Sequence, residues 1–421
     1  MLLDFIFIFI DIRPIINKQM IWKKIKNKKL SFFVSIGAGP NQIPLIKDAK
    51  KLGFNVIGVD ANAMAPGFLL CDLKIQESIE NHEEIYTKLR EMLFDGDIAG
   101  IMTKSYGRAI VTTSFLCEKF NIPHLPYTIA ESFVNKRLMK QTFKDHHILS
   151  PETIKLTSKN KDLPQQKFPM IVKAVTGHGK ENVFFIDSNE SLVSLKKKTS
   201  FKNMIGEKYI EGDEIIAVGL IHKNRYHLVE ITDKERSDLP YFADIKHKTP
   251  SRYQHLLPEI QKIGQSVTNA FQLQTTPLIM ELVLDSDDKL FLIEAVPEFG
   301  GEFLSDILIP ARYQYDIITE AIKAITGKNV KYPQKKKNAN AVVVHYITGK
   351  NGTLASCNPD GPKSIDGIIF ARIFKEIGSP VTVTKTNHDR IGVIIATGKT
   401  LEAAQDATKK AIESFNIRIQ N

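Results

Sequence analysis

The stretch LIMELVLDSDDKLFLIEAVPEFGGEF, residues 278–303, decides the fold. Two apolar runs, Leu278–Leu284 and Leu290–Val296, flank an Asp-rich turn, which predicts a β-hairpin. Glu281 lies within the first run and Glu294 within the second. Carboxylates in apolar strands are costly, and two that face each other repel. A divalent cation would relieve both problems, because Mg²⁺ binds one or two carboxylates alongside water and phosphate oxygens. The alternative is a pair of exposed glutamates on an edge strand.

A second charged strand lies upstream. The run FPMIVKA, residues 168–174, is an apolar strand that contains Lys173, and the glycine-containing segment VTGHGK follows at 175–180. A lysine in an apolar strand needs an anion, and backbone N–H groups of such a loop can bind phosphate oxygens. The pattern therefore favours a phosphate site over a structural loop.

Two further strands and a basic helix lie on either side of this loop. Ile205–Ile210 and Ile215–Ile221 are predicted strands joined by a tight turn, and they carry Glu207, Tyr209 and Glu214 on alternating faces. The pattern from Ile129 to Leu149 is helical, and its basic residues fit a solvated face. These basic residues are Lys136, Arg137, Lys140 and Lys144.

The first part of the chain alternates strands and helices. The glycine turn GAGPNQ, residues 37–42, stands between a strand and a helix, and Asp60 ends the next strand, which predicts a βαβ unit. The turn lacks the third glycine of the dinucleotide fingerprint, so a dehydrogenase is the least favoured alternative. The predicted doubly wound parallel α/β domain spans residues 31–128. Its expected elements are Ser31–Ile36, Ile43–Leu52, Asn55–Val59, Ile98–Thr103, Ala109–Phe120 and Ile122–Leu125.

The remaining boundaries follow from composition. Residues 1–30 form an uncertain N-terminal extension, and the basic, proline-marked segment 333–338 is a linker. Residues 339–421 alternate short strands with a final helix, which predicts a small α+β domain. The elements expected after residue 250 are Leu257–Phe271, Phe303–Ile325, Ala341–Ile347, Val381–Thr384, Arg390–Thr397 and Leu401–Phe415.

Composition fits a cytoplasmic globular protein. The chain has 421 residues, 43% of them hydrophobic, and three scattered cysteines without metal-ligand spacing. A net charge of +10 raises the question of nucleic acid, but no binding motif or aromatic stacking platform accompanies it. The apolar N-terminal run is too short to span a bilayer, so no membrane partner is expected, with a peripheral anchor as the minor alternative.

Taken in order, these features resemble the ATP-grasp superfamily of carboxylate–amine ligases, and within it the L-amino-acid ligase and carbamoyl-phosphate-synthase-like branches. The resemblance covers residues 31 to 421. It implies an ATP-grasp domain at 129–332, in which two α+β subdomains clasp ATP, with the α/β domain before it and the α+β domain after it. It also implies ATP and Mg²⁺ as cofactors, with Mn²⁺ as a substitute, and a homodimer as such ligases often form.

The resemblance also implies roles for individual residues. Lys136 and Lys173 match lysines that contact the phosphates. Glu207 matches the residue that accepts a hydrogen bond from the adenine amino group, and Glu214 matches the residue that accepts from the ribose hydroxyls. Glu281 and Glu294 match the Mg²⁺ ligands. The loop over the triphosphate matches Gly177, His178, Gly179 and Lys180, and the strand along the purine edge matches Lys208, Tyr209 and Ile210.

The sequence departs from the family pattern after Glu294. The family's metal-binding Asn is Val296 here, and its phosphate-stabilising Arg is Glu298. Water and phosphate oxygens alone, or a charge from Arg312, Arg236 or Arg252, are predicted to complete the site. The alternative is a degenerate protein that binds nucleotide for regulation or scaffolding.

Glu298 and His247 are further catalytic candidates. Glu298 suggests a cationic amine substrate, with a structural ion pair to Arg312 or a lysine as the alternative. His247 lies in a segment, 241–250, that resembles the lining of the family's acyl pocket, although a lone loop histidine is more often a surface residue. The sequence thus predicts an ATP- and Mg²⁺-dependent ligase that joins a small-molecule carboxylate to an amine through an acylphosphate, releasing ADP and phosphate.

Overall fold

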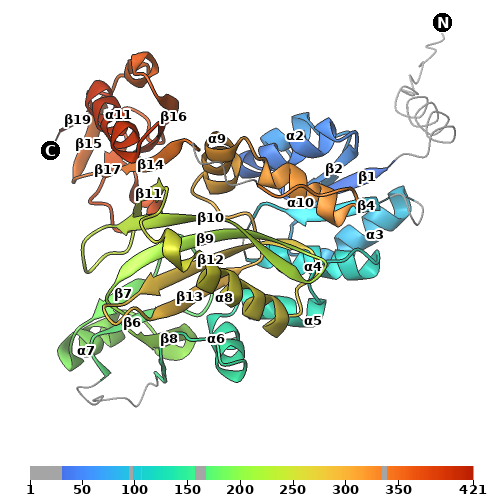
Figure 1. The fold of residues 1–421 in the computed structure, drawn as a ribbon, viewed down its shortest axis with the longest axis horizontal. Helices are drawn as coiled ribbons and strands as arrows, with labels where there is room; N and C mark the ends of the chain where they lie inside the picture. Colours follow the sequence, from blue (N-terminus) through green and yellow to red (C-terminus); the bar gives the residue numbers. More distant parts are fainter. Residues whose placement is uncertain (1–30, 94–97, 106, 157–166, 334–338, 421) are drawn as a thin grey trace, which may run out of the picture.

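The computed structural model describes residues 31–93, 98–105, 107–156, 167–333 and 339–420. The predicted extension 1–30 and residues 334–338 of the predicted linker lie outside them. Figure 1 shows a long central sheet with the blue N-terminal part at one end and the red C-terminal part at the other.

The N-terminal part is a parallel sheet with helices on it, as predicted. Its strand order is β3-β2-β1-β4, and β1 pairs in parallel with both β2 and β4. The apolar strands are buried on both faces, which the covering helices require. The strands are β1 (Phe32–Ile36), β2 (Asn55–Asp60), β3 (Leu73–Gln76) and β4 (Ile98–Thr103), and the helices are α2 (Ile43–Lys51), α3 (His82–Met92) and α4 (Arg108–Lys119).

A small antiparallel sheet follows in the chain. Its order is β5-β8-β6-β7, and it carries the lysine strand and the glycine loop between β6 and β7. Helix α6 begins after Asn135, whose side chain accepts from two backbone N–H groups of the first turn. The elements are α5 (Tyr127–Ala130), α6 (Lys136–Asp145), β5 (Thr153–Ile154), β6 (Met170–Ala174), β7 (Val183–Ile186), α7 (Asn189–Lys198) and β8 (Met204–Lys208).

The large sheet has the order β13-β12-β9-β10-β11-β14-β18-β16. The predicted hairpin forms one end of it, and three C-terminal strands form the other (Figure 1). Its first five strands in chain order are β9 (Asp213–His222), β10 (Arg225–Arg236), β11 (Asp244–Thr249), β12 (Thr276–Leu284) and β13 (Leu290–Val296), with α8 (Leu257–Ala270) packed against β10.

The C-terminal part continues this sheet. Strand β14 pairs with β11, so the predicted C-terminal domain shares its sheet with the predicted ATP-grasp domain. A separate small sheet has the order β17-β15-β19. The elements are β14 (Ala341–Ile347), β15 (Gly352–Ser356), β16 (Ile368–Ile373), β17 (Pro380–Val381), β18 (Gly392–Gly398), α11 (Leu401–Ser414) and β19 (Arg418–Gln420).

Three local predictions were wrong. Ile122–Leu125 forms no strand, because Pro123 has no N–H for a sheet ladder. The helix predicted from Ile129 to Leu149 breaks at Asn135, and the segment 303–325 breaks into a π-helical turn (Leu304–Leu308), α9 (Ile309–Tyr313) and α10 (Ile317–Ile325). Strands β8 and β9 form about where they were predicted, and they belong to different sheets.

One hydrophobic core joins the N-terminal sheet to the large sheet. Helix α10 packs close to β4 at Gly100, where a Cβ would lie 2.9 Å from the methyl group of Thr326 and 3.0 Å from that of Ile325. Gly100 therefore allows this approach, which fixes the parallel sheet relative to the large sheet. No helix among the described residues is long and apolar enough to cross a membrane.

Candidate active site

The two hairpin glutamates face each other across the ladder between β12 and β13. Lys180 Nζ lies 2.9 Å from Glu281 Oε2, and Lys136 Nζ lies 3.2 Å from Glu294 Oε1. Their side chains are 29% and 23% exposed. The alternative of free edge-strand glutamates is therefore wrong, because both carboxylates are ion-paired and mostly buried.

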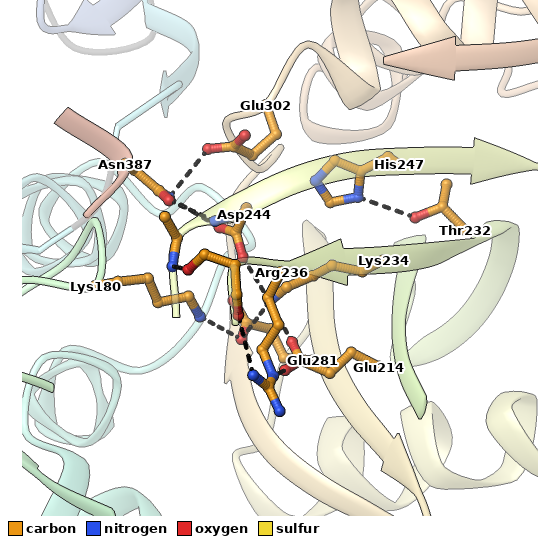
Figure 2. Close-up of polar contacts among 12 residues, drawn as sticks. Lys180, Glu214, Thr232, Lys234, Arg236, Asp244, His247, Glu281, Glu302 and Asn387 are labelled. Atoms are coloured by element: carbon orange, nitrogen blue, oxygen red, sulfur yellow. Dashed lines mark hydrogen bonds and ion pairs between the residues drawn. The ribbon is translucent and has the colours of Figure 1, made fainter. Parts of the chain in front are cut away.

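Lys234, on β10, is the centre of the carboxylate cluster shown in Figure 2. Its Nζ lies 2.9 Å from Glu214 Oε2, 2.9 Å from Asp244 Oδ1 and 3.4 Å from Glu281 Oε2. Burial opposes the charge, but the three carboxylates outweigh burial and raise the pKa of Lys234 well above its usual value. Burial would likewise raise the pKa of Glu281, but Lys180 and Lys234 lower it to about 2. The sequence analysis missed Lys234, which stands in the polar run TDKER.

A second cluster surrounds Glu207 on β8. Lys173 Nζ lies 2.9 Å from Glu207 Oε2, and Lys140 Nζ lies 3.7 Å from Oε1. Burial opposes ionisation of Glu207, but the two lysines outweigh burial and lower its pKa. Lys140 also donates to the carbonyl of Ile293, 2.7 Å away, and burial lowers its pKa to about 8. The interpretation of the 129–149 lysines as a solvated face was therefore wrong for Lys140.

The glycine loop between β6 and β7 lies over the hairpin. Gly177 and Gly179 have φ angles of 137° and 65°, which side-chain-bearing residues rarely adopt. Lys136 Nζ donates to the carbonyl of Gly177, 3.0 Å away, and the ring of His178 lies 6.1 Å from that of His388. The loop is thus held near both glutamates, through Lys136 on one side and Lys180 on the other.

The predicted purine-edge residues connect the two sheets. The backbone N–H of Lys208 donates to the carbonyl of Glu152, and that of Tyr209 donates to the carbonyl of Pro169. Ile210 follows, half-buried, before β9 begins. Arg236 Nη2 donates to the hydroxyl of Tyr209 at 2.8 Å, and its Nε lies 3.1 Å from Glu214 Oε1. Tyr209 and Glu214 are therefore joined through Arg236, and Glu214 also contacts Lys234 of the carboxylate cluster.

The three candidate arginines differ in position. Arg236 belongs to the carboxylate cluster, whereas Arg252 is 60% exposed and pairs with Asp213. Arg312 forms a buried ion pair with Glu230 and donates to the carbonyl of Asn340 at 2.7 Å. The alternative in which Glu298 forms a structural ion pair with Arg312, rather than with a lysine, was therefore wrong.

Glu298 lies beside the N-terminal sheet instead. Burial, opposed by Lys104 and reinforced by Glu294, raises the pKa of Glu298 to about 7. Lys104 follows β4, and its Nζ lies 3.7 Å from Asp306 Oδ2. Ligands of open α/β sheets bind where strand order reverses at the carboxyl ends, which in this sheet is between β1 and β4. Lys104 follows β4 at this edge of the sheet, and Glu298 is close enough for the charge of Lys104 to affect its pKa.

His247 is buried in β11 rather than exposed on a loop. Its ring is 1% exposed, its Nδ1 lies 3.3 Å from Thr232 Oγ1, and its Nε2 has no hydrogen-bond partner. Figure 2 shows it apart from the carboxylate cluster. Burial lowers its pKa against the opposing effect of Glu302 and Asp244. The surface alternative was therefore wrong, because His247 is buried within the sheet.

The donors present fit a magnesium ion that also binds phosphate. Among the described residues no group of three or more His, Cys, Asp or Glu is arranged to hold a metal. Glu281 and Glu294 supply two facing carboxylates, the number that Mg²⁺ commonly takes from protein when phosphates and water complete its shell. The neighbouring lysines would serve the phosphate oxygens.

The N-terminal glycine turn is arranged differently from a dinucleotide site. Asp60 Oδ2 accepts from the N–H of Ala38 at 2.9 Å, and Oδ1 accepts from the N–H of Asn62 at 2.9 Å. This carboxylate therefore braces the turn, where a nicotinamide-cofactor site would need it for the ribose.

Comparisons with known proteins agree with this architecture. A D-alanine–D-alanine ligase from Pelagibacter ubique (strain HTCC1062) is 27% identical over 146 residues, which cover 32% of this chain and 47% of that protein. The chain thus spans about half the length of the curated relative it matches. The crystal structure of L-amino acid ligase from Bacillus licheniformis has a TM-score of 0.78 at 18% identity, covering 94% of this chain and 100% of the other. Phosphoribosylglycinamide synthetase from Anaerococcus prevotii has a TM-score of 0.72 at 22% identity, covering 93% and 100%.

Two family matches define the class. Residues 166–306 match the ATP-grasp domain. Residues 345–420 match the L-amino acid ligase C-terminal domain 2. The predicted fold and the predicted superfamily are confirmed, and the C-terminal match agrees with the L-amino-acid ligase branch.

Proposed function

We propose that this chain is an ATP-dependent carboxylate–amine ligase that uses Mg²⁺ and acts on small molecules. The observation that carries the proposal is the convergence of lysines from β6, α6 and the glycine loop on three strand glutamates. These residues are Lys173, Lys136, Lys180, Glu207, Glu281 and Glu294. Such a set can neutralise a triphosphate and hold one divalent ion.

The proposed reaction has two steps. A substrate carboxylate oxygen attacks the γ-phosphorus of ATP, the bond to ADP breaks, and an acylphosphate forms. The amine nitrogen then attacks the acyl carbon, phosphate leaves, and the amine proton passes to solvent. A magnesium ion held by Glu281 and Glu294 would neutralise charge on the phosphate oxygens. The protein contributes mainly position and electrostatic stabilisation, so no side-chain nucleophile is required.

Glu298 supports a cationic amine as second substrate. Its carboxyl lies near Lys104, and burial raises its pKa to about 7, so a neighbouring cation would favour its ionised form. A carboxylate there would pair with an ammonium group before deprotonation. Glu298→Arg is expected to lose activity with the native amine, and full activity in that variant would refute this assignment.

The deciding experiment measures ADP release with Mg²⁺, ATP and pooled amino acids, comparing wild type with Glu294→Ala. ADP from the wild type alone would establish phosphoryl transfer and let subdivision of the pool identify the substrates. Intact ATP binding without ADP release from any pool would instead favour the degenerate, nucleotide-binding alternative. A cytoplasmic location and a homodimer belong to the same proposal, the first supported by the three scattered cysteines.

A further inference from the structure

A C-terminal segment, Thr386–Arg390, touches the glycine loop across more than two hundred residues of chain. The backbone N–H of Asn387 donates to the carbonyl of Gly179, 3.1 Å away. His388 lies beside the same loop, with its ring 6.1 Å from that of His178. His388 Nε2 also lies 3.7 Å from Glu181 Oε1, so the segment between β6 and β7 is tied to the part of the chain that follows the ATP-grasp match by a backbone hydrogen bond and by this side-chain contact.

The side chain of Asn387 connects this tie to the carboxylate cluster (Figure 2). Its Nδ2 donates to Asp244 Oδ2 at 2.8 Å and lies 3.4 Å from Glu302 Oε1, while its Oδ1 accepts from the N–H of Asp244 at 2.9 Å. Asp244 in turn binds Lys234, which reaches Glu281. The contacts thus run without a gap from the glycine loop to the metal-ligand candidate.

The segment that carries Asn387 is firmly held. Thr386 and Asp389 form a reciprocal capping box around it. Arg390 binds Glu302 through both carboxylate oxygens, at 2.6 and 3.1 Å, and its guanidinium lies 3.7 Å from the centroid of the Tyr346 ring. Asn387 is therefore presented in a fixed position, so its hydrogen bonds cost little ordering entropy.

An amide is the side chain that this position requires. Two carboxylates, Asp244 and Glu302, point at the same Nδ2, so the residue here must donate. A carboxylate in place of the amide would keep the size but add a third negative charge and remove the donor. Charge complementarity, rather than volume, thus sets the residue at 387.

We propose that Asn387 is a positioning residue, through which the C-terminal domain holds the glycine loop over the metal-binding glutamates. The inference rests on the proposed function for its catalytic meaning, since the loop is expected to cover the ATP phosphates. Its structural part, the tie between Asn387 and the loop, stands independently of any activity.

Hydrogen–deuterium exchange of the full-length protein without nucleotide tests the tie directly. Loss of two or three hydrogen bonds should speed exchange of peptides covering residues 175–182 about tenfold in Asn387→Ala. Asn387→Asp should speed it at least as much, because it repels Asp244 and Glu302. Relative to wild type, Asn387→Ala should raise the KM for Mg·ATP about tenfold while kcat changes less than about threefold.

Asn351→Ala is the matched control, because Asn351 lies in the same domain and its side chain accepts only from the N–H of Val383, at 3.2 Å, among its described contacts. Unchanged exchange in both Asn387 variants, or an equal rise in the control, would overturn the inference. A milder effect for the isosteric Asp than for Ala would also overturn it, since that order indicates packing rather than charge. A wild type that fails to bind Mg·ATP would refute the proposed function alone, because exchange is measured without nucleotide.

Discussion

Glu207 and Glu281 are both strand glutamates with two lysine neighbours, but they are built into different surroundings. The Glu207 side chain is 4% exposed, and its lysines come from strand β6 and helix α6. The Glu281 side chain is 29% exposed, and its nearest lysine, Lys180, comes from the glycine loop. The first carboxylate is fixed by regular structure, whereas the second can exchange a loop lysine for another cation.

This difference indicates two different roles for a strand glutamate. A buried, doubly paired carboxylate is an immobile acceptor, and removing it leaves charge without a partner. A partly exposed carboxylate opposite a second one can bind a metal ion without first breaking the core. The following predictions test this distinction.

The largest expected effect is on turnover. Glu281→Gln should lower ADP release about 10³-fold, because it removes one of two metal-binding carboxylates next to the transferring phosphoryl group. Titration of ADP release against Mg²⁺ should show a higher Mg²⁺ requirement in this variant. Asp287→Asn in the hairpin turn, where the side chain is 70% exposed, is the control and should match wild type. A wild-type Mg²⁺ dependence in Glu281→Gln would remove Glu281 from the metal site.

The next largest effect is on stability, where substitution of Glu207 is expected to cost more than substitution of Glu281. Glu207→Gln should cost about 3 kcal/mol, because Lys173 and Lys140 would remain buried without their carboxylate. Glu281→Gln should cost less than about 1 kcal/mol, since Lys234 keeps Glu214 and Asp244 as partners and the Lys180 side chain is 20% exposed. Urea unfolding of both variants gives the comparison. Equal losses would show that burial does not separate the two sites.

The smallest effect concerns Glu298, whose pKa moves in the direction opposite to that of Glu281. Because the folded pKa of about 7 exceeds the unfolded value of 4.5, the folded state holds the proton more tightly. The resulting stabilisation is complete below pH 4.5 and is lost as pH rises through about 7. Glu298→Gln should flatten the pH dependence of stability between pH 4.5 and 7 relative to wild type. An unchanged pH dependence of stability in Glu298→Gln would mean that another titrating group causes it.

The sequence predicted those site residues whose charge interrupts an apolar run. The hairpin strands were predicted almost to the residue, because apolar runs end sharply at an Asp-rich turn, and Lys173 was found because a lysine interrupts such a run. Lys234 and Asp244 lie in polar runs that hide the strands β10 and β11. Their meeting with Glu281 depends on the register of the large sheet, which no local pattern encodes.

The site residues that come from distant parts of the chain could not be predicted from local patterns, for the same reason. Lys140 was taken for a surface lysine because only the packing of α6 against the hairpin buries it. Asn387 reaches Asp244 from the other end of the chain, through strands that had to be assembled first. Lys104 and Glu298 meet only once α10 has docked on β4.

The pairing of β11 with β14 bears on how freely such chains can be recombined. Four residue pairs join the last domain to the sheet, from Lys246 opposite His345 to Thr249 opposite Val342. A gene truncated before residue 339 would leave β11 with a bare row of N–H and C=O groups, a template for aggregation. A chimaera that borrows its C-terminal domain from another ligase must therefore match this four-residue register as well as the sequence at the junction.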